Sequence, residues 1–354
     1  MTEREIVAGD ERTTAGFDLD DVLVDFVNDG EVALDQLLGQ LADDWTLQKT
    51  LTTTNCELAL YEPASNAGVP LVIKQCPGWT ADHVRGLSLT LEACRLHAEV
   101  AGVDSFVAVS RSWGEDPVYL CTDWVDGTDM RQWFAAIFAE LPPDDALARS
   151  LVVSARLAGI VAHYHRAMAD SEPAWTGVPQ KLATREESGS AVRLIRMLRG
   201  GRAVDRSERV RSIDDPGAHN TVVGLDGELW LIDLPAHVSV VTPERDVARL
   251  ASRLVGAIQR HSNSLWVPRM RHYRSVVDAV VDGYVSVGSP GQQPVDLPLV
   301  YACLTSDAVL KVARTRGRRA PGRRLEAFVR ESLAAVGLTA RTLWLRARPR
   351  RRSS

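Results

Sequence analysis

The sequence predicts an α+β protein with two lobes, a small β-rich lobe followed by a larger helical lobe. Short β-like runs, typical of strands, concentrate between residues 45 and 124. From residue 130 onward, apolar residues recur mainly at helical spacing. The chain has 354 residues, of which 45% are hydrophobic and 25% charged. This is an ordinary globular composition, and the length suits two domains or one large bilobed unit.

The first part of the chain divides into an acidic lead, residues 1–30, expected to be mobile, and a small lobe, residues 31–125. An amphipathic helix is predicted over residues 31–44. The predicted strands are Trp45–Leu51, Cys56–Tyr61, Pro70–Cys76, Phe106–Val109 and Val118–Trp124. A helix is predicted over Asp82–Ala101, with Val84, Leu87, Leu91, Cys94 and Leu96 as its apolar positions.

Residues 126–312 are predicted to form the helical lobe. Its expected helices cover Met130–Phe138, Ala146–Ala169, Glu186–Leu198 and most of the chain from Pro243 to Val312. A two-strand insert is expected within it, with strands Thr221–Val223 and Leu229–Ile232 joined by an Asp-Gly turn. No repeat is visible, and residues 313–354 form a separate basic segment.

Charge is distributed unevenly along the chain. The formal net charge is −5, yet the span Lys311–Arg352 carries thirteen Arg and one Lys against two Glu. The first fifty residues carry thirteen acids against three bases. A basic end of this kind, with Trp344 between two leucines, suits an anionic membrane surface. The acidic body disfavours nucleic acid as a partner.

Cysteine usage and the N-terminal sequence bear on location. The five cysteines, Cys56, Cys76, Cys94, Cys121 and Cys303, form no C-x-x-C pair and sit among apolar neighbours. They are therefore interpreted as reduced small hydrophobic residues rather than disulfide or zinc ligands. Residues 1–16 lack the apolar core of a signal peptide, and no run of eighteen uncharged apolar residues occurs. These features predict a cytoplasmic protein, with peripheral association at the inner membrane face left open.

Three polar residues around the predicted hairpin form the strongest candidate site. Asp215 and Asn220 bracket a loop, and Asp233 ends the strand that pairs with the one after Asn220. The hairpin is expected to bring Asn220 and Asp233 together, as two oxygen ligands suited to Mg²⁺. Asp215 could accept or orient the proton of an incoming hydroxyl. The same residues also suit an ordinary turn and a strand-end cap.

This Asp-x4-Asn loop, followed by a strand and a metal-binding Asp, resembles the protein-kinase-like superfamily. Glu228–Asp233, which reads ELWLID, is similar to its aminoglycoside phosphotransferase and small-molecule kinase branch. The resemblance implies a bilobed protein-kinase-like fold, Asp215 as catalytic base, and Asn220 and Asp233 as Mg²⁺ ligands. The segment Arg245–Leu250 is also similar to lipopolysaccharide kinases.

The resemblance extends to the small lobe. Leu71-Val72-Ile73-Lys74 resembles the V-A-I-K strand, which implies that Lys74 binds nucleotide phosphates. Glu92 on the following helix would pair with this lysine, with Glu99 as its competitor. The phosphate loop would lie at Thr53, Thr54 and Asn55, and the adenine would meet the hinge at Asp123 and Trp124.

The same resemblance assigns supporting residues and reveals departures from the family pattern. Asp246, near the start of a helix, would fix the backbone of the catalytic loop, and His165 would be structural. The phosphate loop contains no glycine, and Ile213-Asp214 stand where the family has His-Gly before the catalytic Asp.

Together these residues predict an ATP- and Mg²⁺-dependent phosphotransferase that acts on a hydroxyl of a small molecule or saccharide. Two alternatives remain. One is a kinase of a lipid-linked glycan at the membrane surface, and the other is a pseudokinase scaffold with little or no turnover.

Overall fold

A computed structural model describes eleven stretches of the chain, which form two compact units. The described residues are 45–52, 56–63, 69–76, 78–103, 106–115, 118–170, 209–234, 239–261, 268–288, 295–317 and 336–345. The first unit comprises Met1–Ala81 and Arg111–Trp124, and the second comprises Asp82–Ser110 and Val125–Ser354. The helices predicted over residues 31–44 and 186–198 lie outside the described residues.

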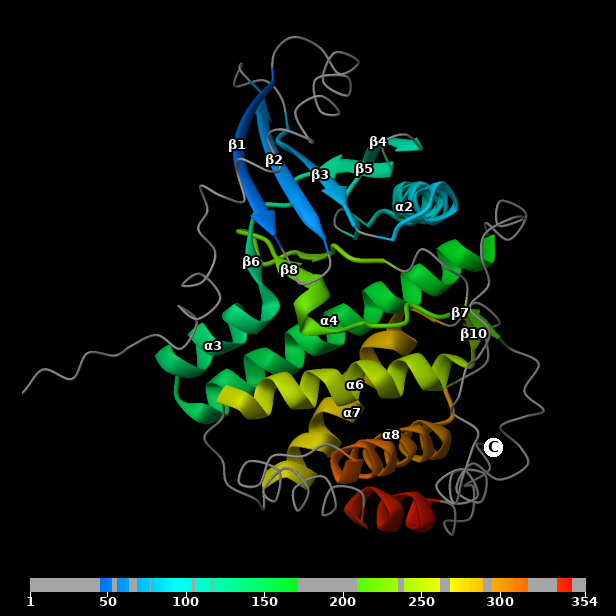
Figure 1. Ribbon diagram of the computed structural model, residues 1–354. Coiled ribbons are helices and arrows are strands. Elements are labelled where there is room, and N and C mark those ends of the chain that lie inside the picture. The colour runs from blue at the N-terminus through cyan, green and yellow to red at the C-terminus, as the bar shows by residue number, and fades with distance from the viewer. Residues whose placement is uncertain are drawn as a thin grey trace, which may run out of the picture. The chain divides into compact units, whose positions relative to one another are not determined.

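A five-stranded sheet with the order β1-β2-β3-β5-β4 dominates the first unit (Figure 1). Its strands are β1 (Trp45–Thr52), β2 (Glu57–Pro63), β3 (Leu71–Gln75), β4 (Ser110–Glu115) and β5 (Val118–Asp123). The pairs β1–β2, β2–β3 and β3–β5 are antiparallel. Alternate residues of neighbouring strands point to one face and form its core, which comprises Ala59, Tyr61, Leu71, Ile73, Tyr119 and Cys121 with Trp45 against it.

One predicted strand is placed incorrectly. The sequence predicted a strand at Phe106–Val109, but the strand in this part of the chain is β4, which begins only at Ser110. Phe106 and Val107 are buried and contact β9 (Leu229–Leu231) instead: Val107 forms a parallel bridge with Leu231, whose backbone N–H donates to the carbonyl of Phe106 at 2.9 Å. The apolar run therefore reflects burial in the second unit rather than membership of the five-stranded sheet.

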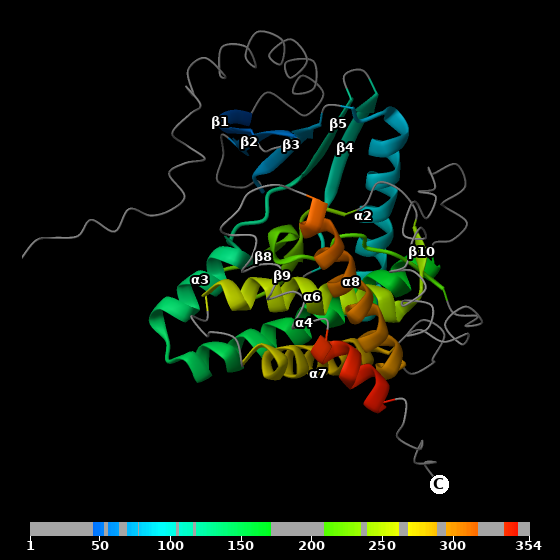
Figure 2. The same ribbon diagram turned by 60° about the horizontal axis from the view of Figure 1, so that its bottom comes forward.

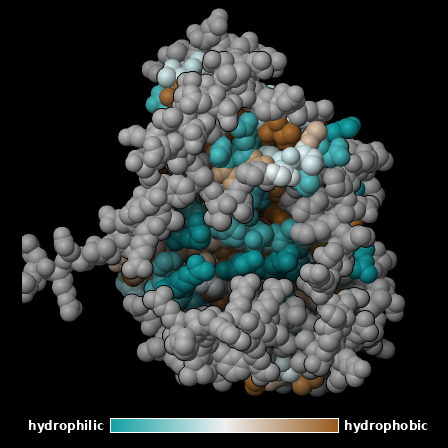
Figure 3. All heavy atoms as spheres, in the orientation of Figure 1, coloured by the Kyte–Doolittle hydropathy of each residue, from teal (hydrophilic) through white to brown (hydrophobic). Residues whose placement is uncertain are grey.

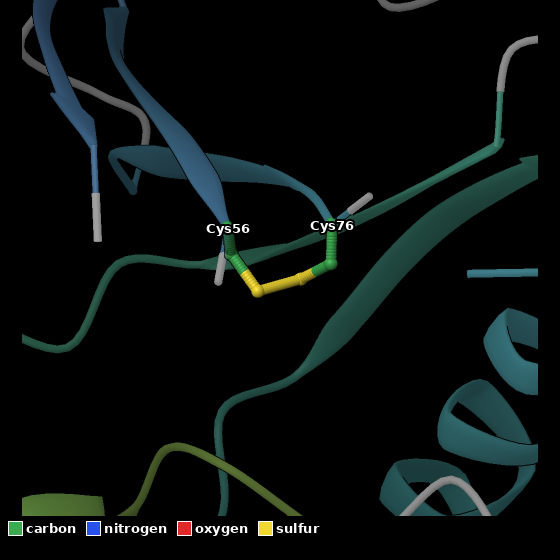
Figure 4. The surroundings of a disulfide bond; sticks show 2 residues. All are labelled: Cys56 and Cys76. Atoms are coloured by element: carbon green, nitrogen blue, oxygen red, sulfur yellow. A yellow bond between two sulfur atoms is a disulfide. The ribbon is translucent and has the colours of Figure 1, made fainter. Parts of the chain in front are cut away.

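The prediction that all cysteines are reduced is wrong for two of them. Cys56 and Cys76 form a disulfide, whereas Cys94, Cys121 and Cys303 are free and buried (Figure 4). The strand register explains the bond. Since β2 and β3 pair Glu57 with Gln75, the next residues outward, Cys56 and Cys76, stand opposite each other. A separation of 20 residues gives no C-x-x-C signal, so the pairing depends on the register and not on local spacing.

The second unit is mainly helical (Figure 2). Its helices are α2 (Ala81–Ala101), α3 (Met130–Glu140), α4 (Pro143–Asp170), α6 (Pro243–His261), α7 (Pro268–Val287) and α8 (Leu297–Gly317). On α2, which was predicted as part of the small lobe, the expected positions Val84, Leu87, Leu91 and Cys94 are buried. Leu96 is an exception, with 49% of its surface exposed. With a sheet first and helices after it, the predicted α+β class is confirmed.

Helix α4 is the longest helix of the described residues. It packs along α7 and also contacts α6 and α3. Among the described residues, α4 is the one helix with the length and mean hydropathy to cross a membrane, but 56% of its most apolar window is buried within the protein. Burial against α7 accounts for its apolar composition as a core helix.

The predicted hairpin insert is present beside these helices. Strands β8 (Thr221–Val223) and β9 (Leu229–Leu231) pair antiparallel, and β6 (Thr128–Asp129) adds a third strand next to β8. Asp129 also caps α3, because its carboxylate accepts a hydrogen bond from the Arg131 backbone N–H at 2.7 Å. Two short strands, β7 (Val210–Arg211) and β10 (Val240–Val241), form a separate pair.

Part of the basic C-terminal segment is a helix over residues 336–345. Its Leu338 and Thr342 are fully buried, and the Thr342 hydroxyl lies 3.2 Å from that of Thr305 on α8. Trp344 remains 43% exposed, with the Arg341 guanidinium 4.2 Å from its ring centroid. Contact of this segment with a membrane surface stays a prediction.

Candidate functional site

The candidate site is built on the loop that runs from β7 to β8. A single buried carboxylate, that of Asp246 on α6, holds the start of this loop. Its oxygens accept hydrogen bonds from the Ser212 hydroxyl at 2.7 Å and the Ile213 backbone N–H at 2.8 Å. Asp246 therefore fixes the loop backbone two residues before Asp215, as the resemblance to kinases predicts.

A buried histidine completes this support. His165 of α4 lies with Nε2 3.1 Å from the Asp246 carboxylate and Nδ1 2.7 Å from the Tyr284 hydroxyl. All three side chains are buried, so each polar group depends on the others for its hydrogen bonds. His165 is a structural histidine, as predicted. The network ties α4, α6 and α7 to the loop that carries Asp215.

Asp214 adopts an uncommon backbone conformation directly before Asp215. Its φ is +60°, in the left-handed region that favours glycine but that Asp tolerates better than most residues. The Ser239 hydroxyl donates to its carboxylate at 3.2 Å, and its own N–H donates to the Ser212 hydroxyl at 3.0 Å. Asp214 thus supplies the conformation at the position where the family pattern has glycine.

We expect Asp214→Val to lower the free energy of unfolding by about 1–3 kcal/mol, because a β-branched residue is strained at positive φ. Asp214→Gly loses the bonds to Ser239 but removes the strain, so its change should stay within about 1 kcal/mol. Urea unfolding of both variants tests this. Equal losses would show that the side-chain bonds, and not the backbone conformation, determine the residue at this position.

Asp215 is half exposed and lies between two cationic or ionisable side chains. His219 Nε2 is 3.2 Å from its Oδ2, and Arg253 Nε on α6 is 3.1 Å from its Oδ1. The Arg253 N–H is close to Oδ1 but is not aligned to donate a hydrogen bond. Oδ1 is sheltered from solvent and accepts no hydrogen bond from the described residues. This oxygen keeps its capacity to accept a proton or hydrogen bond from a ligand.

Gly217 allows His219 to fold back toward Asp215. A Cβ at residue 217 would lie 2.6 Å from ring atoms of His219, well inside contact distance. Sequence analysis missed both partners of Asp215. Arg253 could have been found, since it lies seven residues after Asp246 on a predicted helix and falls near it after two turns.

Asn220 and Asp233 approach each other through the hairpin register. Asn220 ends a 3-10 turn, η3 (Ala218–Asn220), and is nearly buried. Its carbonyl accepts a hydrogen bond from the Ile232 backbone N–H at 3.0 Å, which places it beside the residue before Asp233. The Asn220 side-chain N–H donates to the Asp215 carbonyl at 3.1 Å, which leaves its amide oxygen for a ligand.

These two residues fit a magnesium ion. Amide and carboxylate oxygens are the donors that Mg²⁺ prefers, and Mg²⁺ bound with substrate phosphates needs only one or two protein ligands. Asp233 is exposed after β9 and so accessible to a ligand. Within the described residues, no group of three His, Cys, Asp or Glu offers an all-protein metal site.

In the first unit, Lys74 lies on β3 between β2 and β5. It pairs with Leu58 on one side and Leu120 on the other. Its neighbour Ile73 points into the core, so the half-buried Lys74 lies on the opposite face. The ammonium lies 5.5 Å from the ring centroid of Trp79, a cation–π contact.

The other predicted nucleotide-binding residues of this unit have backbone or side-chain partners. Arg111 donates from Nη2 to Asp123 Oδ2 at 2.8 Å, and the Trp124 N–H donates to the Pro70 carbonyl at 2.7 Å. While the Trp124 N–H is bonded to Pro70, an adenine that contacts Trp124 would have to bond to the Trp124 backbone carbonyl. The predicted phosphate-loop residues Thr53, Thr54 and Asn55 lie outside the described residues.

Glu92 belongs to the second unit and lies on the exposed face of α2. Arg95 donates to it from Nε at 2.9 Å and from Nη2 at 2.7 Å. These bonds lower the pKa of the Glu92 carboxyl below its usual value. Glu99, the alternative partner for Lys74, is also paired with Arg95. The assignment of Glu92 to Lys74 stays a prediction.

Comparison with known proteins finds similarity in structure alone. No protein-family model matches the sequence, and no curated protein matches it significantly. The structure is similar to an amicoumacin kinase, hAmiN, solved with AMP-PNP, Ca²⁺ and Ami, with a TM-score of 0.55 and 10% identity over 94% of this chain and 96% of that one.

Two further solved structures are similar at lower scores. The choline kinase LicA from Streptococcus pneumoniae has a TM-score of 0.45 and 12% identity over 88% of this chain and 99% of that one. The macrolide 2'-phosphotransferase MphH from Brachybacterium faecium has a TM-score of 0.43 and 13% identity over 86% and 96%. The similarity to the amicoumacin kinase shows that the chain has a protein-kinase-like fold of the kind found in small-molecule kinases, as predicted.

Proposed function

We propose that this protein is a phosphotransferase that moves the γ-phosphate of ATP to a hydroxyl of a small molecule or saccharide. The observation that carries the proposal is the loop geometry. Asp246 anchors the loop, Asp215 presents a carboxylate oxygen that accepts no hydrogen bond from the described residues, and Asn220 lies beside the segment that carries Asp233. The similar amicoumacin kinase was solved with a nucleotide analogue and a divalent cation, which supports the same ligand classes here.

Each residue has a defined role in the proposed reaction. The acceptor oxygen bonds to the γ-phosphorus while the bond from that phosphorus to the ADP oxygen breaks. Asp215 orients the acceptor hydroxyl and takes its proton. Asn220 and Asp233 would hold Mg²⁺, which neutralises phosphate charge when bound. Lys74 would bind the nucleotide phosphates as a point charge.

We expect Asp215→Asn and Asp233→Asn each to reduce phosphoryl transfer at least about 100-fold, because one loses the base and the other a metal ligand. ADP release by the purified full chain with Mg²⁺ and ATP, across aminoglycosides, sugars, lipid-linked glycans and protein acceptors, measures the effect. Asp226→Asn is the matched control, since it removes the same charge from the exposed turn of the same hairpin. Chelation of divalent cations should abolish turnover until Mg²⁺ is restored.

Unaltered turnover in both variants would refute the assigned site. Absence of both ADP release and a thermal shift with Mg²⁺ and ATP would instead favour a scaffold without activity. A cytoplasmic location also remains a proposal. The Cys56–Cys76 disulfide removes the support that cysteine usage had given it, because disulfides are typical of oxidising compartments.

A further inference from the structure

Arginines follow one face of α6 beside the Asp215 loop. Arg245, Arg249 and Arg253 are spaced four residues apart and so lie on the same face of the helix. Figure 3 shows hydrophilic residues gathered over the part of the surface where α6 lies. The side chains of Arg249 and Arg253 are 32% and 48% exposed, so both can meet a ligand from solvent.

Both guanidinium groups are directed at the two aspartates of the loop. Arg253 Nε is 3.1 Å from Asp215 Oδ1, and Arg249 Nη1 is 3.7 Å from Asp214 Oδ1. These are the ion pairs that the two arginines make with other described residues. In neither pair does the geometry meet the requirements of a hydrogen bond. A guanidinium has five N–H donors, and in each case most of them remain for a further acceptor.

This arrangement constrains any molecule whose hydroxyl reaches Asp215. A hydroxyl that reaches Asp215 Oδ1 lies close to Arg253, whose Nε is 3.1 Å from that oxygen, and Arg249 is one helical turn away on the same face. An ammonium group has no acceptor for the N–H donors of the two guanidinium groups, so it could not use them. A carboxylate or phosphate would instead match the planar fork of a guanidinium and use its remaining donors.

We infer that the acceptor is an anionic hydroxy compound, with a carboxylate or phosphate group that Arg249 and Arg253 bind while its hydroxyl faces Asp215. This inference rests on the proposed function and names the substrate class of the same site. When the acceptor binds, its anionic group would replace Asp215 Oδ1 as the partner of Arg253. Asp215 would then be left to orient the hydroxyl. The anion is thus both the recognised group and the group that separates the ion pair in the structure.

Matched acceptor sets test the inference. One set is galactose, galacturonate and galactosamine, and the other is glycerol, glycerate and glycerol 3-phosphate, which distinguishes a carboxylate from a phosphate. We measure kcat/KM by ADP release and, separately, binding by calorimetry without nucleotide. The expected result is a preference of at least tenfold for an anionic member over its neutral partner. Preference for the neutral or amino member, or no preference for an anion in either assay, overturns the inference.

Variants assign the preference to the two arginines. Arg249→Met and Arg253→Met should each reduce the ratio of anionic to neutral acceptor at least tenfold, and Arg253→Lys should restore part of it. Arg260→Met removes the same charge from an exposed position on the same helix and should leave the ratio unchanged. An unchanged ratio in both methionine variants overturns the inference. Arginine-dependent binding of an anion without any ADP release supports the anion site while it contradicts the proposed transfer reaction.

Discussion

Replacement of Asp246 by Ala is expected to lower the free energy of unfolding by about 3–5 kcal/mol, the usual cost of removing one partner from a buried charged network. The carboxylate has no exposed surface and accepts bonds from Ser212, Ile213 and His165. Without it, a buried hydroxyl, a buried backbone N–H and a buried imidazole each lose a hydrogen-bond partner, and leaving such groups unsatisfied is costly.

The same substitution should abolish phosphoryl transfer even where the protein stays folded. The Ile213 N–H would no longer fix the loop, so Asp215 would lose its position relative to Asn220. Urea unfolding and ADP release at a temperature well below the midpoint measure the two effects. Asp282→Ala, which removes an exposed carboxylate from α7, is the control and should change stability by less than about 0.5 kcal/mol. Equal stability of the Asp246 and Asp282 variants would contradict the network.

Substitution of Gly283 by Ala is expected to destabilise the protein by about 3 kcal/mol, at the upper end of typical overpacking costs. Gly283 lies on α7 where it crosses α4. A Cβ there would lie 2.0 Å from the carbonyl oxygen of Ala155, a backbone atom that cannot rotate away. The two helices would have to separate, and the apolar contacts of α4 would loosen along their length.

Gly256→Ala provides the opposite expectation with the same chemical change. Gly256 is on the exposed side of α6, and a Cβ there meets nothing within 4 Å. Since alanine is the better helix former, this variant should gain about 0.5–1 kcal/mol. Thermal unfolding of the two variants side by side is sufficient. A similar change in both would show that the approach of α7 to α4 is less close than described.

The sequence predicted the elements of the fold well where a local pattern determines them. The alternation in β2 and β3 and the helical spacing in α3 and α4 locate those elements within a few residues. Phe106 and Val107 were misplaced because an apolar run shows burial and not the strand it pairs with. Leu96 was misplaced because burial at a helix end depends on which neighbour covers it.

The candidate site divides in the same way. Asp215, Asn220 and Asp233 were found because a loop spacing and one hairpin register determine their arrangement. His219 was not found, since its contact with Asp215 depends on how the loop folds back, and Arg253 was overlooked although its spacing from Asp246 on a predicted helix places it near the loop. Glu92 was chosen for an apolar neighbourhood in the sequence, yet three-dimensional packing leaves it exposed beside Arg95.

The disulfide between Cys56 and Cys76 has a consequence for Lys74. It joins the ends of β2 and β3 one position beyond the Glu57–Gln75 pair. The pair on the other side of Glu57–Gln75 contains Lys74. A slip of one residue between two strands would turn every side chain of the moving strand to the other face of the sheet. The covalent bond forbids that slip, because only one alignment sets the two sulfurs opposite each other. The disulfide thus fixes the alignment of β2 and β3, and with it the face of the sheet from which Lys74 projects.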